Sequence, residues 1–160
     1  MTIDERTLLV APCGIDCGTC DLYLCRDNKH LFNALIKKGI PEKKLPCAGC
    51  RETRGNCPVT GRQCATYLCV TENGVGFCFD CGDFPCSKLN PSANRAYVLP
   101  HNLKVFNLCT IRRDGVKGFI EKSADIKDKY YKGKIEVGKG PQPEDRYSHL
   151  INTLRRNFTV

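Results

Sequence analysis

The side chains in this sequence best suited to chemistry are its thirteen cysteines, twelve of which lie between residues 13 and 86. Three pairs have the spacing Cys-x-x-Cys, namely Cys17/Cys20, Cys47/Cys50 and Cys78/Cys81. This spacing lets two thiolates of one tight turn bind the same metal ion while backbone N–H groups bond the sulfurs. We therefore expect each pair to supply half of a tetrahedral metal site. The candidate ligands are Cys13, Cys17, Cys20, Cys25, Cys47, Cys50, Cys57, Cys64, Cys69, Cys78, Cys81 and Cys86.

Zinc is the ion that this pattern favours, because scattered cysteine pairs are typical of small structural zinc sites closed by four thiolates. Two or three Zn²⁺ ions are expected. Such a closed site has no vacant position for a substrate, so catalysis is not favoured, and no catalytic residue is predicted. The three histidines, His30, His101 and His149, fit solvated or packed positions better than metal ligation.

An iron–sulfur cluster is the alternative to zinc. The spacing Cys13-x3-Cys17-x2-Cys20 is the one that radical-SAM enzymes use to hold a [4Fe–4S] cluster, but their large barrel cannot fit in 160 residues. The regular cysteine run of bacterial ferredoxins is also missing. Free or redox-active thiols are a further alternative. The thirteenth cysteine, Cys109, is expected to be a buried helix thiol.

The sequence leaves open which cysteines share an ion. Taking them four at a time in chain order gives three sites. An interleaved arrangement, in which the first cysteine group pairs with the third, is the other option. If Cys25 or Cys57 is not a ligand, two sites and some odd thiols result.

The net charge of +8 is unevenly distributed along the chain. Residues 1–94 carry 11 basic and 10 acidic side chains, or +1, and residues 95–160 carry 14 and 7, or +7. Twelve bound thiolates with three Zn²⁺ would add −12 + 6 = −6 and leave the protein near +2. The bulk charge therefore does not by itself indicate a nucleic-acid partner.

The cellular compartment follows from the N-terminus and the cysteine usage. The first ten residues have acids where a signal peptide has lysines, and no stretch is apolar enough to span a membrane. A cytoplasmic location is expected, where thiols are kept reduced.

Hydrophobic spacing predicts a small, metal-stabilised, mostly α protein with little β structure. A cysteine-rich metal-binding region, residues 1–94, is expected to pack as one unit with a basic helical region, residues 95–160. Residues 45–64 are too polar to fold by apolar burial alone and need metal to order them. The predicted helices cover residues 21–38, 65–73, 102–113, 116–131 and 143–158, with strands at 8–10 and 134–137 and a linker at 138–142.

The order of the motifs resembles one bacterial and archaeal family, the domain of unknown function 3795. The motifs are Cys-Gly-Ile-Asp-Cys-x-x-Cys, Cys-Ala-Gly-Cys-Arg, Cys-x4-Cys, Gly-Val-x-Phe-Cys-Phe-Asp-Cys-x-x-Phe-Pro-Cys and Pro-His-Asn-Leu, and the likeness extends from Cys13 to Phe119. It implies a small cytosolic zinc-binding protein with no assigned activity. The match is weaker at Cys25 and Cys57. Members often have a further Cys-x-x-Cys after the 116–131 helix, where this chain has residues 132–137 without cysteine.

These observations predict a zinc-binding protein of unassigned activity that serves as a metal-stabilised interaction module. Its partner is expected to be a protein, with no membrane partner. Nucleic acid is a weaker alternative, since the lysines of residues 127–134 alternate with Tyr130 and Tyr131 and could bind a phosphate backbone. The alternative function is electron transfer by an iron–sulfur or thiol redox protein, and an enzyme or enzyme subunit is the weakest hypothesis.

Overall fold

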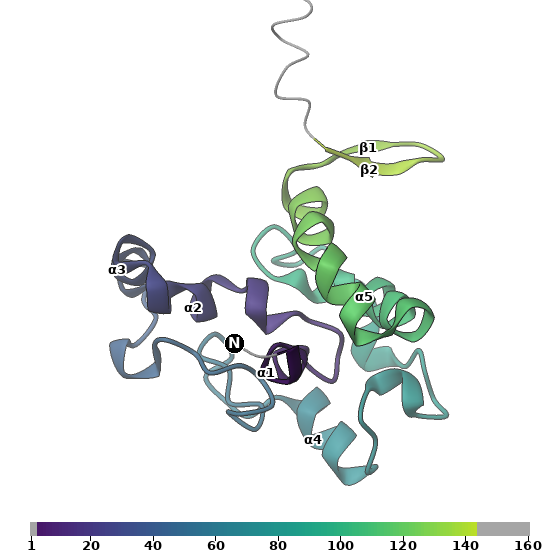
Figure 1. Ribbon diagram of the computed structural model, residues 1–160, viewed down its shortest axis with the longest axis horizontal. Coiled ribbons are helices and arrows are strands. Elements are labelled where there is room, and N and C mark those ends of the chain that lie inside the picture. The colour runs from purple at the N-terminus through teal and green to yellow at the C-terminus, as the bar shows by residue number, and fades with distance from the viewer. Residues whose placement is uncertain (1–2, 144–160) are drawn as a thin grey trace, which may run out of the picture. The chain divides into compact units, whose positions relative to one another are not determined.

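A computed structural model describes residues 3–143 of the chain (Figure 1). The structure divides into two compact units, of which the first ends at Ala124 and the second begins at Asp125. It is about 53% helical and its sheet has two short strands, so the prediction of a mostly α fold with little β is confirmed. The change of composition near residue 94 falls inside the first unit, and a domain division at that residue stays a prediction.

The elements follow one another along the chain as short helices joined by loops, with one long helix near the end. The α-helices are α1 (Ile3–Leu8), α2 (Asp21–Leu24), α3 (Lys29–Lys37), α4 (Ala65–Glu72) and α5 (Lys104–Lys132). The 3-10 helices are η1 (Cys17–Thr19), η2 (Cys25–Asp27), η3 (Glu42–Lys44), η4 (Cys78–Asp80), η5 (Ser87–Leu89) and η6 (Pro100–Leu103). The strands are β1 (Lys134–Glu136) and β2 (Gly140–Gln142), paired antiparallel.

The predicted strand at residues 8–10 is wrong, because α1 runs to Leu8 and the chain then turns back on itself. Val10 makes only an isolated bridge with Asp16, and the flanking bonds join Ala11 N–H to the Ile15 carbonyl and Cys17 N–H to the Leu9 carbonyl, both at 2.8 Å. A single bridge of this kind positions the first cysteine loop without forming a sheet.

The predicted helix over residues 21–38 is interrupted in its middle. Asn28 leaves the helical region (φ −140°, ψ 94°), and its side-chain oxygen accepts a hydrogen bond of 2.9 Å from the Leu31 N–H. This is an N-cap, so a new helix begins at Lys29. Gly39, at φ +88°, follows the end of α3 as the sequence predicts.

The remaining predictions agree better with the structure. Helix α4 matches the predicted 65–73, and α5 contains both later predicted helices, joined at Gly115 (φ +74°, ψ +169°). Strand β1 confirms the one predicted at 134–137, but the expected linker at 138–142 is wrong because it contains β2. The predicted helix at 143–158 lies almost entirely outside the described residues.

The apolar core of the first unit contains side chains from residues 9–35, from Val70 and Leu89, and from α5. Val10, Leu89, Leu108 and Phe119 are fully enclosed. The other buried apolar residues are Leu9, Ala11, Leu22, Tyr23, Cys25, Leu35, Val70 and Ile111. Residues 46–88 contribute only Val70 to this set, although eight of the thirteen cysteines fall there.

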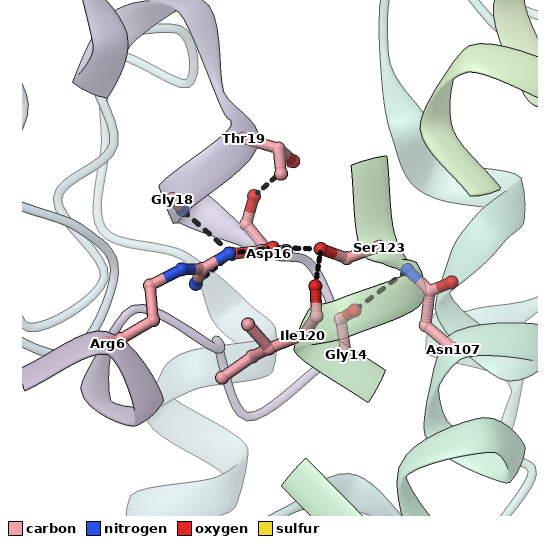
Figure 2. Close-up of polar contacts among 8 residues, drawn as sticks. All are labelled: Arg6, Gly14, Asp16, Gly18, Thr19, Asn107, Ile120 and Ser123. Carbon is pink, nitrogen blue, oxygen red and sulfur yellow. Dashed lines mark hydrogen bonds and ion pairs between the residues drawn. The ribbon is translucent and has the colours of Figure 1, made fainter. Parts of the chain in front are cut away.

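A buried polar network around Asp16 fastens the first cysteine loop to α5 (Figure 2). Its carboxylate accepts two bonds from the Arg6 guanidinium, at 2.7 and 2.5 Å, and one of 2.8 Å from the Gly18 N–H. The Ser123 hydroxyl of α5 donates a further bond of 2.5 Å. Because the Asp16 side chain is only 3% exposed, these partners replace the water that a buried carboxylate has lost.

A second contact in Figure 2 joins the same loop to α5 at Gly14. The Asn107 amide donates a bond of 2.9 Å to the Gly14 carbonyl. Gly14 has φ +83°, and a Cβ placed on it would lie 3.0 Å from Leu108 Cγ and 3.0 Å from the Lys104 carbonyl oxygen. Only glycine fits both the backbone angle and the space against α5.

Replacing Asp16 with Asn should lower the free energy of unfolding by about 3 kcal/mol, because it leaves the Arg6 guanidinium without its buried counter-ion. The matched control is Asp125→Asn, whose carboxylate pairs with Lys129 at the surface and is 63% exposed. That change should stay within about 0.5 kcal/mol. Urea unfolding followed by circular dichroism measures both, and equal effects would contradict the role given to Asp16.

Gly14→Ala should destabilise the protein more than Gly39→Ala, although both positions have positive φ. Each substitution carries a backbone penalty of about 1 kcal/mol. At Gly14 the added methyl also meets α5, which adds about 1–3 kcal/mol, whereas nothing lies within 4 Å of a Cβ at Gly39. Similar urea midpoints for the two variants would show that the loop does not pack tightly on α5.

Candidate metal centre

The twelve predicted cysteines are free thiols of the first unit, and their contacts divide them for description into three overlapping clusters. Cluster A contains Cys13, Cys17, Cys50 and Cys64; cluster B contains Cys20, Cys25, Cys47 and Cys57; cluster C contains Cys69, Cys78, Cys81 and Cys86. Cys109 lies outside them, exposed on α5, so the prediction that it is buried is wrong.

Cluster A joins the first cysteine loop to the loop that follows residue 46. The Cys17 sulfur accepts a bond of 3.4 Å from the Cys50 N–H. Two backbone bonds of 2.9 Å, from the Gly55 N–H to the Cys50 carbonyl and from the Cys64 N–H to the Gly55 carbonyl, bring Cys64 to the same place.

The pKa values in cluster A record how closely its thiols are packed. Burial and, to a smaller extent, the nearby thiols of Cys13, Cys64 and Cys57 raise the pKa of Cys50 to about 12. Burial also raises the pKa of Cys17, which the bond from the Cys50 N–H opposes. The pKa of Cys13 is raised mainly by burial, and Lys104 lowers it. Without a cation among them, these buried thiols hold their protons.

Cluster B surrounds the small apolar core formed by Leu22, Cys25 and Leu35. Cys20, Cys47 and Cys57 pack against that core from loops on either side. The Cys47 N–H donates a bond of 2.8 Å to the Leu22 carbonyl, and the Cys25 thiol donates one of 3.3 Å to the same carbonyl. Burial raises the pKa of Cys47, and the Cys57 and Cys25 thiols add to the rise.

The four cysteines of cluster C line one small cavity of about 30 Å³. Cys69 comes from α4, Cys78 from η4, and the Asn73 amide donates to the Cys69 sulfur at 3.7 Å. Burial and, to a smaller extent, the nearby thiols of Cys13 and Cys86 raise the pKa of Cys78 to about 12.

The clusters have the donor chemistry of zinc sites, but their sulfurs are not placed around a common point. Four thiols each are the ligands that Zn²⁺ prefers for structural sites. Within residues 3–143, however, no group of three or more His, Cys, Asp or Glu side chains is arranged to hold an ion. Binding would therefore require thiol side chains to rotate toward one another.

The structure places the three Cys-x-x-Cys pairs in different surroundings, and whether the two members of each pair share an ion stays a prediction. Cys78 and Cys81 both line the cavity of cluster C. The Cys47 N–H bonds the Leu22 carbonyl, whereas the Cys50 N–H bonds the Cys17 sulfur. Cys20 packs against the core of cluster B and also lies near Cys17, so clusters A and B adjoin.

Asp16 and Arg51 hold the cysteine clusters in place, although the sequence alone predicts no role for either. Asp16 organises the first loop, and Arg51 ties three segments together. The Arg51 guanidinium donates hydrogen bonds to the carbonyls of Val10, at 2.9 Å, and Gly76, at 3.0 Å. It also lies 4.9 Å from the centre of the Phe77 ring. Both residues stand inside cysteine motifs, which is the signal that could have identified them.

The described histidines lie in positions that agree with the predictions. His30 is exposed on α3, and His101 Nε2 lies 2.6 Å from the Asn90 carbonyl oxygen, so it holds a loop. His149 lies outside the described residues.

Comparison with known proteins gives one match. The family described as "Protein of unknown function (DUF3795)" matches residues 9–91, which is more than half of the chain and includes all three clusters. A search of the curated proteins finds no match, and neither does a search of the solved structures. The chain belongs to the DUF3795 family of unknown function.

Proposed function

We propose that this protein binds two or three Zn²⁺ ions through clusters A, B and C and serves as a metal-stabilised interaction module in the cytoplasm. The observation that carries the proposal is the content of residues 46–88. Val70 and Pro58 are their buried apolar side chains, and the eight cysteines of this segment are all partly buried.

The free energies involved favour metal as the stabilising element. Ordering the backbone of one residue opposes folding by about 1–2 kcal/mol, whereas burying one valine contributes about 1.5–3 kcal/mol. Apolar burial at Val70 therefore cannot offset the ordering of this segment. A structural zinc site contributes about 10 kcal/mol or more, which is several times the contribution of one buried valine.

A role without catalysis is supported by the ligands themselves. A zinc ion closed by four thiolates has no open position for a substrate or an activated water. The histidines that could leave such a position open are not near the clusters in the described part of the chain. His30 is exposed on α3, and His101 binds a backbone carbonyl.

A protein partner is favoured over nucleic acid by the surface of each unit. In the first unit, Tyr97, Val98 and Phe106 are 80%, 49% and 59% exposed, and exposed apolar side chains close in sequence are typical of protein-binding surfaces. The lysines of residues 125–143 are largely compensated, because Asp125, Asp128 and Glu136 pair with Lys129, Lys132 and Lys139. Among the described residues, no helix is long and apolar enough to cross a membrane.

The full chain, purified from metal-replete cells under reducing conditions, should contain two or three zinc ions per molecule by elemental analysis. Removing them with a strong chelator should unfold the cysteine-rich part, because the buried thiols lose the cation that draws them together. Circular dichroism should then show a loss of helix that returns when zinc is added. Cys109→Ser is the control, and it should keep every ion, since this thiol lies outside the clusters.

Two outcomes would overturn the zinc proposal. A colourless protein without bound ions that keeps its helix content would show that the thiols need no metal. A brown protein that contains iron and sulfide and bleaches on reduction would assign an iron–sulfur cluster instead.

Binding of a single-stranded oligonucleotide to the full chain should be weak and should disappear as salt rises from about 50 to 200 mM, because residues 125–143 carry five lysines against three acids. Fluorescence anisotropy measures this directly. Binding that stays tight at the higher salt concentration would make nucleic acid the partner.

A further inference from the structure

The Cys78 N–H joins the last group of cysteines to the first cysteine loop. It donates a hydrogen bond of 2.9 Å to the carbonyl of Pro12, the residue that directly precedes Cys13. Residues 76–86, which contain Cys78 and two further cysteines, are distant from Pro12 in the sequence. They nevertheless depend on that loop for one of their backbone bonds, so they are not self-contained.

Arg51 makes a second connection between the same two segments. Its Nε donates a bond of 2.9 Å to the Val10 carbonyl, and its Nη2 donates one of 3.0 Å to the Gly76 carbonyl. Each of these carbonyls belongs to the second residue before a partner of the backbone bond, so the two connections join the segments at neighbouring positions. The planar guanidinium holds both carbonyls at once, which the flexible ammonium of a lysine does less rigidly.

The first cysteine loop is itself fastened to α5. The Ser123 hydroxyl bonds the Asp16 carboxylate, and the Asn107 amide bonds the Gly14 carbonyl (Figure 2). Asp16, Asn107 and Ser123 are all buried. The loop therefore has a fixed position on α5, and residues 76–86 are joined to it there.

Residues 76–86 have few contacts of their own that could order them. The structure describes all of these residues, and none of them is buried. Phe77 and Phe79 stack with their ring centres 5.2 Å apart, but both remain partly exposed. Because apolar burial is what ordinarily offsets the entropy of ordering a chain, the bonds to the first cysteine loop matter more here than they would in a buried segment.

We propose that residues 76–86 and the first cysteine loop become ordered together, and that Arg51 is the positioning residue that couples them. Loss of its bridge frees residues 76–86 as a whole rather than Gly76 alone. A ligand that orders one of the two segments therefore favours order in the other. The inference does not rest on the proposed zinc binding, because it follows from hydrogen bonds between parts of the protein.

Amide hydrogen exchange of the full chain, resolved by residue with NMR, tests the coupling in Arg51→Ala. The Phe84 N–H is the reporter, because its partner, the Cys81 carbonyl at 3.2 Å, lies inside residues 76–86. Loss of two bonds from a charged donor should raise the exchange rates of the Phe84 and Cys78 N–H groups by a similar factor, about tenfold or more. A purely local effect of the substitution would not reach Phe84.

Two controls separate this coupling from a general loss of stability. The Phe32 N–H in α3, which bonds the Asn28 carbonyl at 2.9 Å, should keep its exchange rate in Arg51→Ala. Arg62→Ala, which removes an exposed arginine of the same cysteine-rich region, should change none of these rates. A rise at Cys78 alone, no rise at all, or an equal rise in α3 would overturn the coupling.

A second measurement uses the unmodified chain and stays decisive if Arg51→Ala does not fold. The Cys17 N–H bonds the Leu9 carbonyl at 2.8 Å and reports on the first cysteine loop. In low concentrations of urea, the Phe84 and Cys17 N–H groups should exchange through one shared opening with the same urea dependence. Exchange of Phe84 through an opening with a weaker urea dependence would overturn the inference. Absence of bound metal from the same sample would contradict the proposed function and leave this comparison intact, so the two failures are distinguishable.

Discussion

The shortage of apolar side chains in residues 46–88 is the constraint on which the rest of this structure depends. A folded segment of this length ordinarily encloses several aliphatic or aromatic residues, and here Val70 and Pro58 are the apolar residues that are buried. The eight thiols of the segment are small and only partly buried. Under the proposed function, Zn²⁺ bound by these thiols supplies the stabilisation that apolar burial does not.

The first cysteine loop is organised differently, by charge and by close packing. Asp16 holds its own turn through Gly18 and reaches both Arg6 in α1 and Ser123 in α5. Gly14 lies against α5 closely enough to exclude a side chain. Cys13 and Cys17 of cluster A belong to this loop, which Asp16 and Gly14 hold against α5. The loop therefore positions the Cys17 sulfur that the Cys50 N–H contacts.

Some of these features could be predicted from the sequence, and others could not, for reasons that particular residues make clear. The ends of the helical stretch after residue 20 follow from apolar spacing and Gly39, but its interruption depends on one capping side chain, Asn28. The strand predicted at residues 8–10 is wrong because α1 extends to Leu8, and an apolar run as short as Leu8 to Val10 fits both periods. The kink at Gly115 agrees with the prediction because glycine marks it directly.

The cysteines illustrate the same limit at the candidate site. Their types and spacing mark them as candidate ligands from the sequence alone. Which of them meet depends on tertiary contacts that no spacing encodes, such as the bond from the Cys50 N–H to the Cys17 sulfur. The roles of Asp16 and Arg51 could not be predicted from the sequence, because their partners lie far away in the chain or are backbone carbonyls.

The central claim, that ions bound to sulfur keep residues 46–88 folded, is tested most directly by amide hydrogen exchange of the full chain before and after chelation. The account predicts that the protected N–H groups of Cys47, Gly55 and Cys64, which bond backbone carbonyls in the structure, lose their protection when metal is removed and regain it when zinc returns. Unchanged protection of these amides in metal-free protein would contradict it.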